Sequence, residues 1–156
     1  MQCDTRPDAV DVRVVDAHHH LINLREVDYP WIRQRSPVLE ALLENYYDIA
    51  HDYDVDDYLS DVADARLIAS VACGFGAADG VAEAEWVQSS NDSRGFPHAF
   101  IAAVDLASAS TEEVLARYRD LPVVRAVRQP LYWARPAAAA GGAAGLPHGS
   151  RLVARV

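Results

Sequence analysis

The sequence predicts an α/β fold in which about four parallel strands form one sheet and are joined by crossover helices. Short apolar runs alternate four times with segments of helical spacing, and such alternation is typical of parallel sheets. Three consecutive histidines, His18 to His20, follow the first apolar run, at the place where a doubly wound fold would usually carry a Gly-rich phosphate loop. The chain of 156 residues is long enough to bury a sizeable core.

The expected strands are short runs of β-branched and small apolar residues. Such runs, bounded by glycine, proline or polar turn residues, are typical of buried strands. The glycines after Cys73 end the second run, and Pro130 ends the fourth. We expect the four strands near residues 12–17, 67–73, 98–104 and 123–129.

The expected helices lie over residues 54–65, 80–95 and 110–121. Asp54 can cap the first of them, because a carboxylate accepts hydrogen bonds from free amides at a helix start. Ser110 and Glu113 have the spacing of a capping box at the third helix. Residues 23–39 contain two prolines and scattered aromatic residues, and this composition predicts a long loop.

The net charge of -9 at pH 7 argues against a nucleic-acid backbone or an anionic membrane surface as the main partner. No apolar stretch approaches the length of a transmembrane helix. The polar, acidic segment before Val14 does not have the apolar core of a signal peptide. We therefore expect a cytoplasmic protein in which Cys3 and Cys73 are free thiols.

The charge pattern divides the chain into three parts: an N-terminal segment over 1–11, a folded unit over 12–133 and a tail over 134–156. No acidic residue follows Asp120, and the tail is rich in Ala, Gly and Pro without apolar periodicity. Two interpretations stay open for the tail, a disordered segment or a loss of reading frame near Trp133.

The histidine run has the spacing of a metal site. Side chains alternate along a strand, so His18 and His20 point the same way, Asp16 shares their face, and His19 points to the other. Two imidazoles at a strand end can bind one divalent ion. We expect Asp16 to support the strand end or to orient a ligand. The alternative is that these histidines only make hydrogen bonds at the strand end.

Four stretches, in order, resemble one known family. They are "VVDAHHHLINLREVDYPWI", "AEAEWVQ", "GFPHAFIAAVDL" and "VVRAVRQPLYW", and together they run from about Val12 to Trp133. The first stretch pairs the Asp-x-His-x-His pattern with Tyr-Pro-Trp a few residues on. The sequence resembles the amidohydrolase-related proteins, the group that includes L-fuconolactonase-like and other sugar-lactone and dicarboxylate-lactone hydrolases.

This resemblance implies a distorted (β/α)8 TIM barrel, of which the chain would form a part. It implies His18 and His20 as ligands of a divalent metal, zinc or manganese, and leaves open a relative that works without metal. It implies hydrolysis of a lactone, ester or amide by an activated water, with Arg128 and Gln129 facing a small substrate that is a lactone or bears a carboxylate. A plain surface ion pair is the alternative for Arg128.

The sequence also departs from the family pattern. Ala72 stands where a histidine is often found, and the chain has no lysine that could form a carboxylated metal bridge. A complete barrel needs about 250 residues, so we expect an incomplete N-terminal half that lacks the catalytic aspartate. The first interpretation is a hydrolase that shows no lactonase activity as this chain alone. The alternative is a non-catalytic relic or interaction module with weak metal binding, and in both cases we expect self-association through open sheet edges.

Overall fold

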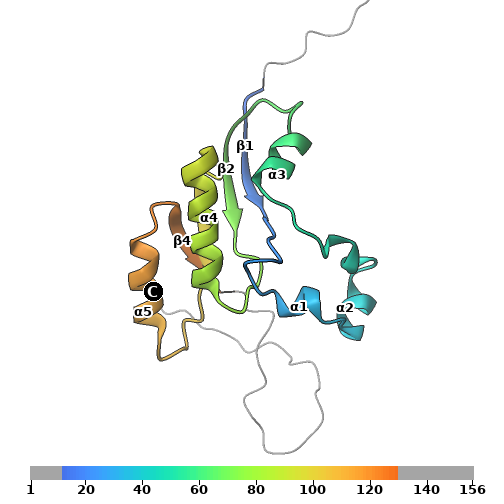
Figure 1. Ribbon diagram of the computed structural model, residues 1–156, viewed down its shortest axis with the longest axis vertical. Coiled ribbons are helices and arrows are strands. Elements are labelled where there is room, and N and C mark those ends of the chain that lie inside the picture. Colours follow the sequence, from blue (N-terminus) through green and yellow to red (C-terminus); the bar gives the residue numbers. More distant parts are fainter. Residues whose placement is uncertain (1–11, 130–156) are drawn as a thin grey trace, which may run out of the picture.

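The computed structural model describes residues 12–129 of the chain. All four expected strands are present and form one sheet in which every neighbouring pair is parallel. Each strand overlaps the range expected for it, so the predicted parallel α/β sheet is confirmed (Figure 1). The strands are β1 (Val14–His19), β2 (Leu67–Cys73), β3 (Ala99–Ala103) and β4 (Val124–Arg128).

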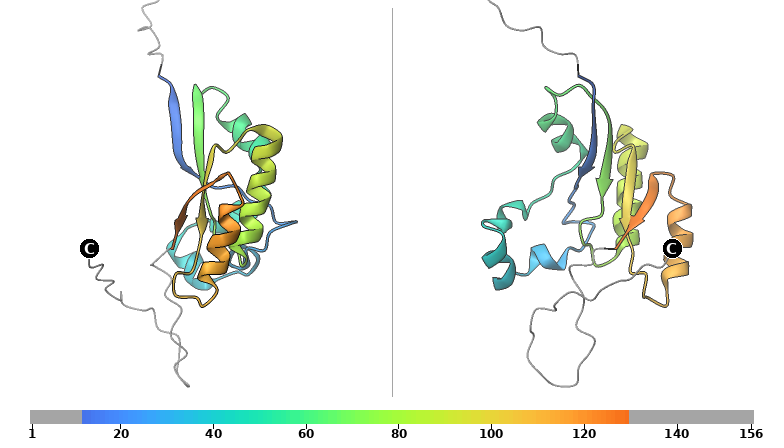
Figure 2. Two further views of the ribbon diagram at one scale, coloured as in Figure 1. Left: turned by 90° about the vertical axis from the view of Figure 1, so that its left-hand side faces the viewer. Right: turned by 180° about the vertical axis from the view of Figure 1, so that it is seen from behind.

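The order of the strands in the sheet is their order in the chain, β1-β2-β3-β4. The connections contain α3 (Val55–Asp61), α4 (Gly80–Arg94) and α5 (Thr111–Arg119), which all cover the same face (Figure 2, left). A doubly wound sheet would reverse its strand order and carry helices on both faces. A sequential order with one covered face is that of consecutive units in a βα barrel.

The core lies between the sheet and its covering helices. Phe100 and Ala102 of β3 point to this side and are buried, as are Ala84 and Val87 of α4. Tyr118 of α5 is also buried and donates its hydroxyl hydrogen bond to the carbonyl of Ala103. This packing fixes the carboxyl ends of β2 and β3 relative to the helices. The histidine run and Arg128 lie at the same edge of the sheet, at the ends of the outer strands β1 and β4.

The start of α3 follows the sequence prediction, whereas the start of α5 does not. Asp54 accepts hydrogen bonds from the amides of Asp56 and Asp57, and the Asp57 side chain accepts one from the Asp54 amide. Ser110 precedes α5 but makes no capping hydrogen bond, so the predicted capping box with Glu113 is wrong. Its hydroxyl is hydrogen-bonded to the hydroxyl of Ser108 instead, at 2.8 Å.

The region expected as a long loop contains two short helices, α1 (Pro30–Arg33) and α2 (Pro37–Leu42). Each begins with a proline, whose fixed φ suits the first helical turn and whose missing amide costs nothing there. The prolines that indicated a loop therefore mark helix starts. Both helices lie beyond the carboxyl ends of β1 and β2 (Figure 1), where they can form a wall beside the sheet edge.

The outer strands of the sheet are β1 and β4, and no other described strand pairs with their outer edges. Self-association through these edges stays a prediction. The expected segment over 1–11 and the tail over 134–156 lie outside the described residues. Among the helices of residues 12–129, none combines the length and the apolar character needed to cross a membrane.

Candidate functional site

Two histidine side chains converge at the carboxyl end of β1. The Nε2 atoms of His18 and His20 are 3.3 Å apart, and the two rings meet edge to face at 85°. The Nδ1 atom of His20 lies 2.8 Å from the carbonyl oxygen of Cys73 at the end of β2. Because a carbonyl only accepts, Nδ1 carries the proton, and the Nε2 atom of neutral His20 has a lone pair that accepts the hydrogen bond from Nε2 of His18 and could instead bind a metal ion.

This pair has the geometry of two ligands for one ion. Zinc–imidazole bonds of about 2.0–2.1 Å in a tetrahedral arrangement place two ligand nitrogens about 3.3–3.4 Å apart, which matches the observed separation of the Nε2 atoms. Metal-binding histidines usually donate their other ring hydrogen to a carbonyl or carboxylate, as His20 does to Cys73. Burial lowers the pKa of His20 and so favours the neutral, metal-binding form.

The described residues supply only these two ligands. No group of three His, Cys, Asp or Glu side chains within residues 12–129 is placed to hold a metal ion. Ala72, which stands where relatives of the resembled family often carry a histidine, is buried in β2 and has no donor atom in its side chain. A bound ion would therefore be held loosely by this part of the chain.

A bulge in β1 separates Asp16 from the histidine pair. Asp16 pairs with Ser70 and His19 with Ala72, so three steps along β1 match two along β2. The extra residue shifts the alternation by one, and the prediction that Asp16 shares the face of the pair is wrong. The Asp16 carboxylate accepts hydrogen bonds from the Tyr58 hydroxyl and the His18 amide, both at 3.0 Å. These contacts support the strand end, which is one of the two roles expected for Asp16; orientation of a ligand, the other role, stays a prediction.

His19 points away from the pair, as the sequence predicts. Its ring stacks on Tyr58 with a centroid separation of 4.0 Å. Both ring nitrogens are buried without a hydrogen-bond partner, and burial lowers the pKa of His19. In this position His19 packs the strand against α3 and is not available as a third ligand.

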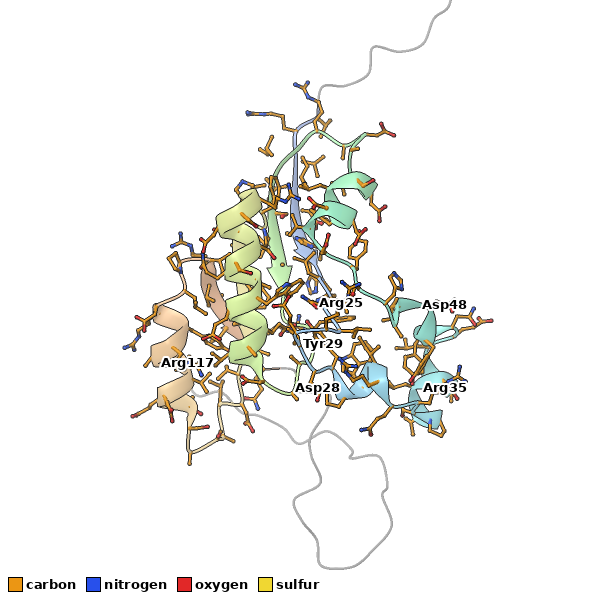
Figure 3. The ribbon with its side chains drawn as sticks, in the orientation of Figure 1. Arg25, Asp28, Tyr29, Arg35, Asp48 and Arg117 are labelled. Atoms are coloured by element: carbon orange, nitrogen blue, oxygen red, sulfur yellow. The ribbon has the colours of Figure 1, made fainter. Side chains whose placement is uncertain are left out.

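An open cleft of about 920 Å³ adjoins His20. Gly74 to Gly76 form the floor, Arg128 lies at the end of β4, and one wall is formed by Pro30, Trp31, Gln34, Arg35, Ser36, Pro37, Leu39 and Leu43. Figure 3 shows Tyr29 inside the molecule near the carboxyl ends of the strands, and Arg35 further out among α1 and α2. The volume is within the range of about 300–1,000 Å³ that is usual for small-molecule sites.

The floor of the cleft is held by interlocking aromatic rings. The indole Nε1 of Trp31 donates a hydrogen bond to the carbonyl of Phe75 at 2.8 Å, and the two rings meet edge to face at 4.8 Å. The Phe75 ring in turn lies 4.3 Å from the ring of His20. These contacts join the wall, the floor and the histidine pair into one packed unit.

The two predicted substrate-binding residues occupy different places. Arg128 lines the cleft together with His20 and forms no ion pair with the described residues. Gln129 accepts a hydrogen bond from the Leu106 amide at 3.1 Å and donates one to Asp105 at 3.3 Å. Gln129 therefore holds the loop after β3 and is not among the lining residues. A role in binding substrate stays a prediction for both residues.

Glu83 is a buried polar residue that the sequence pattern did not single out. It lies on α4 with 1% of its surface exposed, and its Oε1 accepts a hydrogen bond from the Phe75 amide at 2.8 Å. Oε2 makes no hydrogen bond of normal geometry, nor does the hydroxyl of the neighbouring Tyr29, although the two interact electrostatically. Glu83 lies four residues before buried Val87 and therefore on the same face of the helix. This spacing was the sequence signal that could have predicted its burial.

Gly76 makes the close approach between floor and wall possible. Its φ is +81°, and a Cβ atom there would lie 3.1 Å from Nε1 of Trp31. We expect Gly76→Ala to lower the free energy of unfolding by more than the about 1–2 kcal/mol that a left-handed backbone alone costs, and to change the Trp31 fluorescence. Urea unfolding measures both effects.

Gly95→Ala is the matched control for that change. Gly95 also has a left-handed backbone, with φ of +72°, but a Cβ atom there would meet no atom within 4 Å. The difference between the two variants isolates the contact with Trp31. Equal losses of stability in the two variants would show that a Cβ atom at position 76 causes no strain against Trp31.

The fold and the site together define an α/β protein with a histidine pair and a cleft at the carboxyl edge of a singly wound sheet. Comparison with known proteins finds no matching family model. The chain is 27% identical over 123 residues to the uncharacterized protein y4mH of Sinorhizobium fredii (strain NBRC 101917 / NGR234), an alignment that covers 78% of this chain and 41% of that relative. The chain thus spans less than half the length of this relative.

A solved structure is also similar in part. Amidohydrolase 2 from Bifidobacterium longum subsp. infantis superposes with a TM-score of 0.46 at 19% identity. The match covers 59% of this chain and 32% of that protein.

Proposed function

We propose that this chain contributes the metal-binding and substrate-binding edge of an amidohydrolase-type hydrolase that acts on a lactone or a related ester or amide. The observation that carries the proposal is the 3.3 Å separation of the Nε2 atoms of His18 and His20, with His20 oriented by the Cys73 carbonyl. The sequence resemblance from Val12 to Trp133 supports the same class of reaction.

Each described residue has a distinct part in this proposal. His18 and His20 would hold a zinc or manganese ion, and Cys73 fixes the ring of His20 through its carbonyl. A divalent ion bound there would supply Lewis acidity and lower the pKa of a nearby water. Arg128, at the edge of the cleft, would bind a carboxylate or a developing negative charge on the substrate.

A second candidate function is non-catalytic, a relic or interaction module that binds metal weakly. It is favoured by one observation: no Asp or Glu is among the described residues that line the cleft. Glu83 is buried behind Phe75, and Asp16 points to the other side of β1. The described residues thus offer no carboxylate that could act as general base toward a substrate in the cleft.

Chemical rescue distinguishes the two functions. We expect the zinc-loaded chain alone to show no hydrolysis of aryl esters or lactones above the uncatalysed rate, because a base is missing from the described cleft. Added acetate should restore measurable hydrolysis if His18 and His20 hold a functional metal site. Initial rates with and without acetate, and with a chelator, give the measurement.

His51→Ala serves as the control, because His51 is exposed and its ring only contacts the carbonyl of Asp48. Rescue should survive in this variant and disappear when His18 and His20 are both replaced with alanine. Rescue that persists in the double variant would show that the histidine pair has no part in hydrolysis. The absence of rescue in the wild-type chain would favour the non-catalytic function.

A further inference from the structure

We infer that the cleft selects a carboxylate with an apolar aryl or alkyl body, and that it selects against polyhydroxylated sugar lactones. This inference rests on the proposed function and names its substrate class. It follows from two features of the cleft, the apolar character of the wall and the absence of an ion pair between Arg128 and the described residues.

The wall and floor are built mainly from apolar and aromatic side chains. Those that face the cleft are Pro30, Trp31, Pro37, Leu39, Leu43 and Phe75. Burying a hydrocarbon or aryl body against them gains roughly 25 cal/mol for each Å² removed from water. The rings of Trp31 and Phe75 are fixed by their mutual contact and the indole hydrogen bond, so little side-chain entropy is lost when a ligand binds.

Apart from Gln34, the polar side chains of the wall have partners among the described residues. The Ser36 hydroxyl accepts a hydrogen bond from the Leu39 amide, and the Trp31 indole donates to Phe75. The Arg35 guanidinium forms an ion pair with Glu40 at 3.4 Å and lies 4.7 Å above the Tyr47 ring. Each hydroxyl of a sugar that enters such a wall without a partner costs free energy, so a sugar lactone is a poor fit.

Arg128 differs from Arg35 although both line the cleft. It makes no ion pair with the described residues, and its charge acts on His20, Cys73 and Glu83 around it. A guanidinium that forms no ion pair with the described residues and lies at the end of an apolar surface suits a ligand with a single carboxylate. The apolar body then lies along the wall, and the carboxylate points toward β4.

The test uses three probes on the full chain: 3-phenylpropionate, its uncharged amide, and galactono-1,4-lactone. Binding is followed by NMR through the indole N–H signal of Trp31, assigned with Trp31→Phe. We expect 3-phenylpropionate to bind at least about tenfold more tightly than the amide, because a hydrogen bond to a charged group contributes that much. The sugar lactone should bind more weakly than both.

Three arginine variants carry the test. Arg128→Gln should remove the preference for the carboxylate over the amide, Arg128→Lys should keep part of it, and Arg117→Gln should leave it unchanged, because Arg117 pairs with Glu85 and does not line the cleft. Unfolding midpoints of all variants show whether each is folded. An unchanged preference in Arg128→Gln, or equal binding of galactono-1,4-lactone and 3-phenylpropionate to the wild-type chain, would overturn the inference.

The outcome is separable from that of the proposed function. Carboxylate binding in a chain that takes up no metal would reject the metal-assisted hydrolase and leave this inference intact. Metal binding together with indifference to the three probes would reject the inference and leave the proposed function intact.

Discussion

Replacing both His18 and His20 with alanine is expected to abolish binding of zinc or manganese. The two Nε2 atoms, 3.3 Å apart, would supply the ligands in the described part of the chain. Removing an outer hydrogen-bond partner of a metal ligand already costs roughly 10–100-fold in affinity, so loss of both ligands should exceed that range. Isothermal titration with zinc, and metal content after dialysis, measure the change.

His51→Ala and His19→Ala provide two controls with different meanings. His51 is exposed and remote from the pair in its contacts, so its loss should leave affinity for zinc unchanged. His19 belongs to the same run but stacks on Tyr58, so its loss should reduce stability more than affinity. Unchanged metal content in the double variant of His18 and His20 would reject the metal-site assignment.

The second large effect concerns Glu83 and the dependence of stability on pH. Burial raises the pKa of Glu83 to about 7 from its ordinary value of 4.5. The folded state therefore holds a proton that the unfolded state has released between these two values. The free energy of unfolding should fall by about 3 kcal/mol as the pH rises from about 4.5 to about 7, relative to Glu83→Gln.

The neighbours of Glu83 act against the effect of burial on its pKa. The positive charge of Arg128 and the hydroxyl of Tyr29 lower its pKa, as does the amide of Phe75, but burial outweighs all three. Urea unfolding at a series of pH values measures the effect. Glu85→Gln is the matched control, because Glu85 is exposed on the same helix and pairs with Arg117. The same slope in wild-type protein and Glu83→Gln would show that Glu83 stays ionised.

Several parts of the site followed from local sequence patterns. The alternation of apolar runs with helical segments predicted a parallel sheet. The histidines at the end of the first apolar run were therefore expected at the carboxyl edge of that sheet. Strand alternation placed His18 and His20 on one face, with His19 on the other, and the structure agrees. These features depend on how side chains alternate along a strand or repeat along a helix, and on neighbours only a few residues away. They can therefore be predicted from the sequence alone.

Other features depend on segments that are distant in the chain. The bulge that turns Asp16 toward Tyr58 arises from the register between β1 and β2, which strand periodicity alone does not reveal. The burial of Glu83 required the turn at Phe75 to fold onto α4. Likewise, Arg128 and Arg35 have the same chemistry in the sequence, and only the structure shows that Arg35 pairs with Glu40 and lies over the Tyr47 ring, whereas Arg128 acts on Cys73 and Glu83 from distant parts of the chain. Composition and spacing thus determined the fold class and the histidine pair, whereas long-range packing decided which polar groups remain free to meet a ligand.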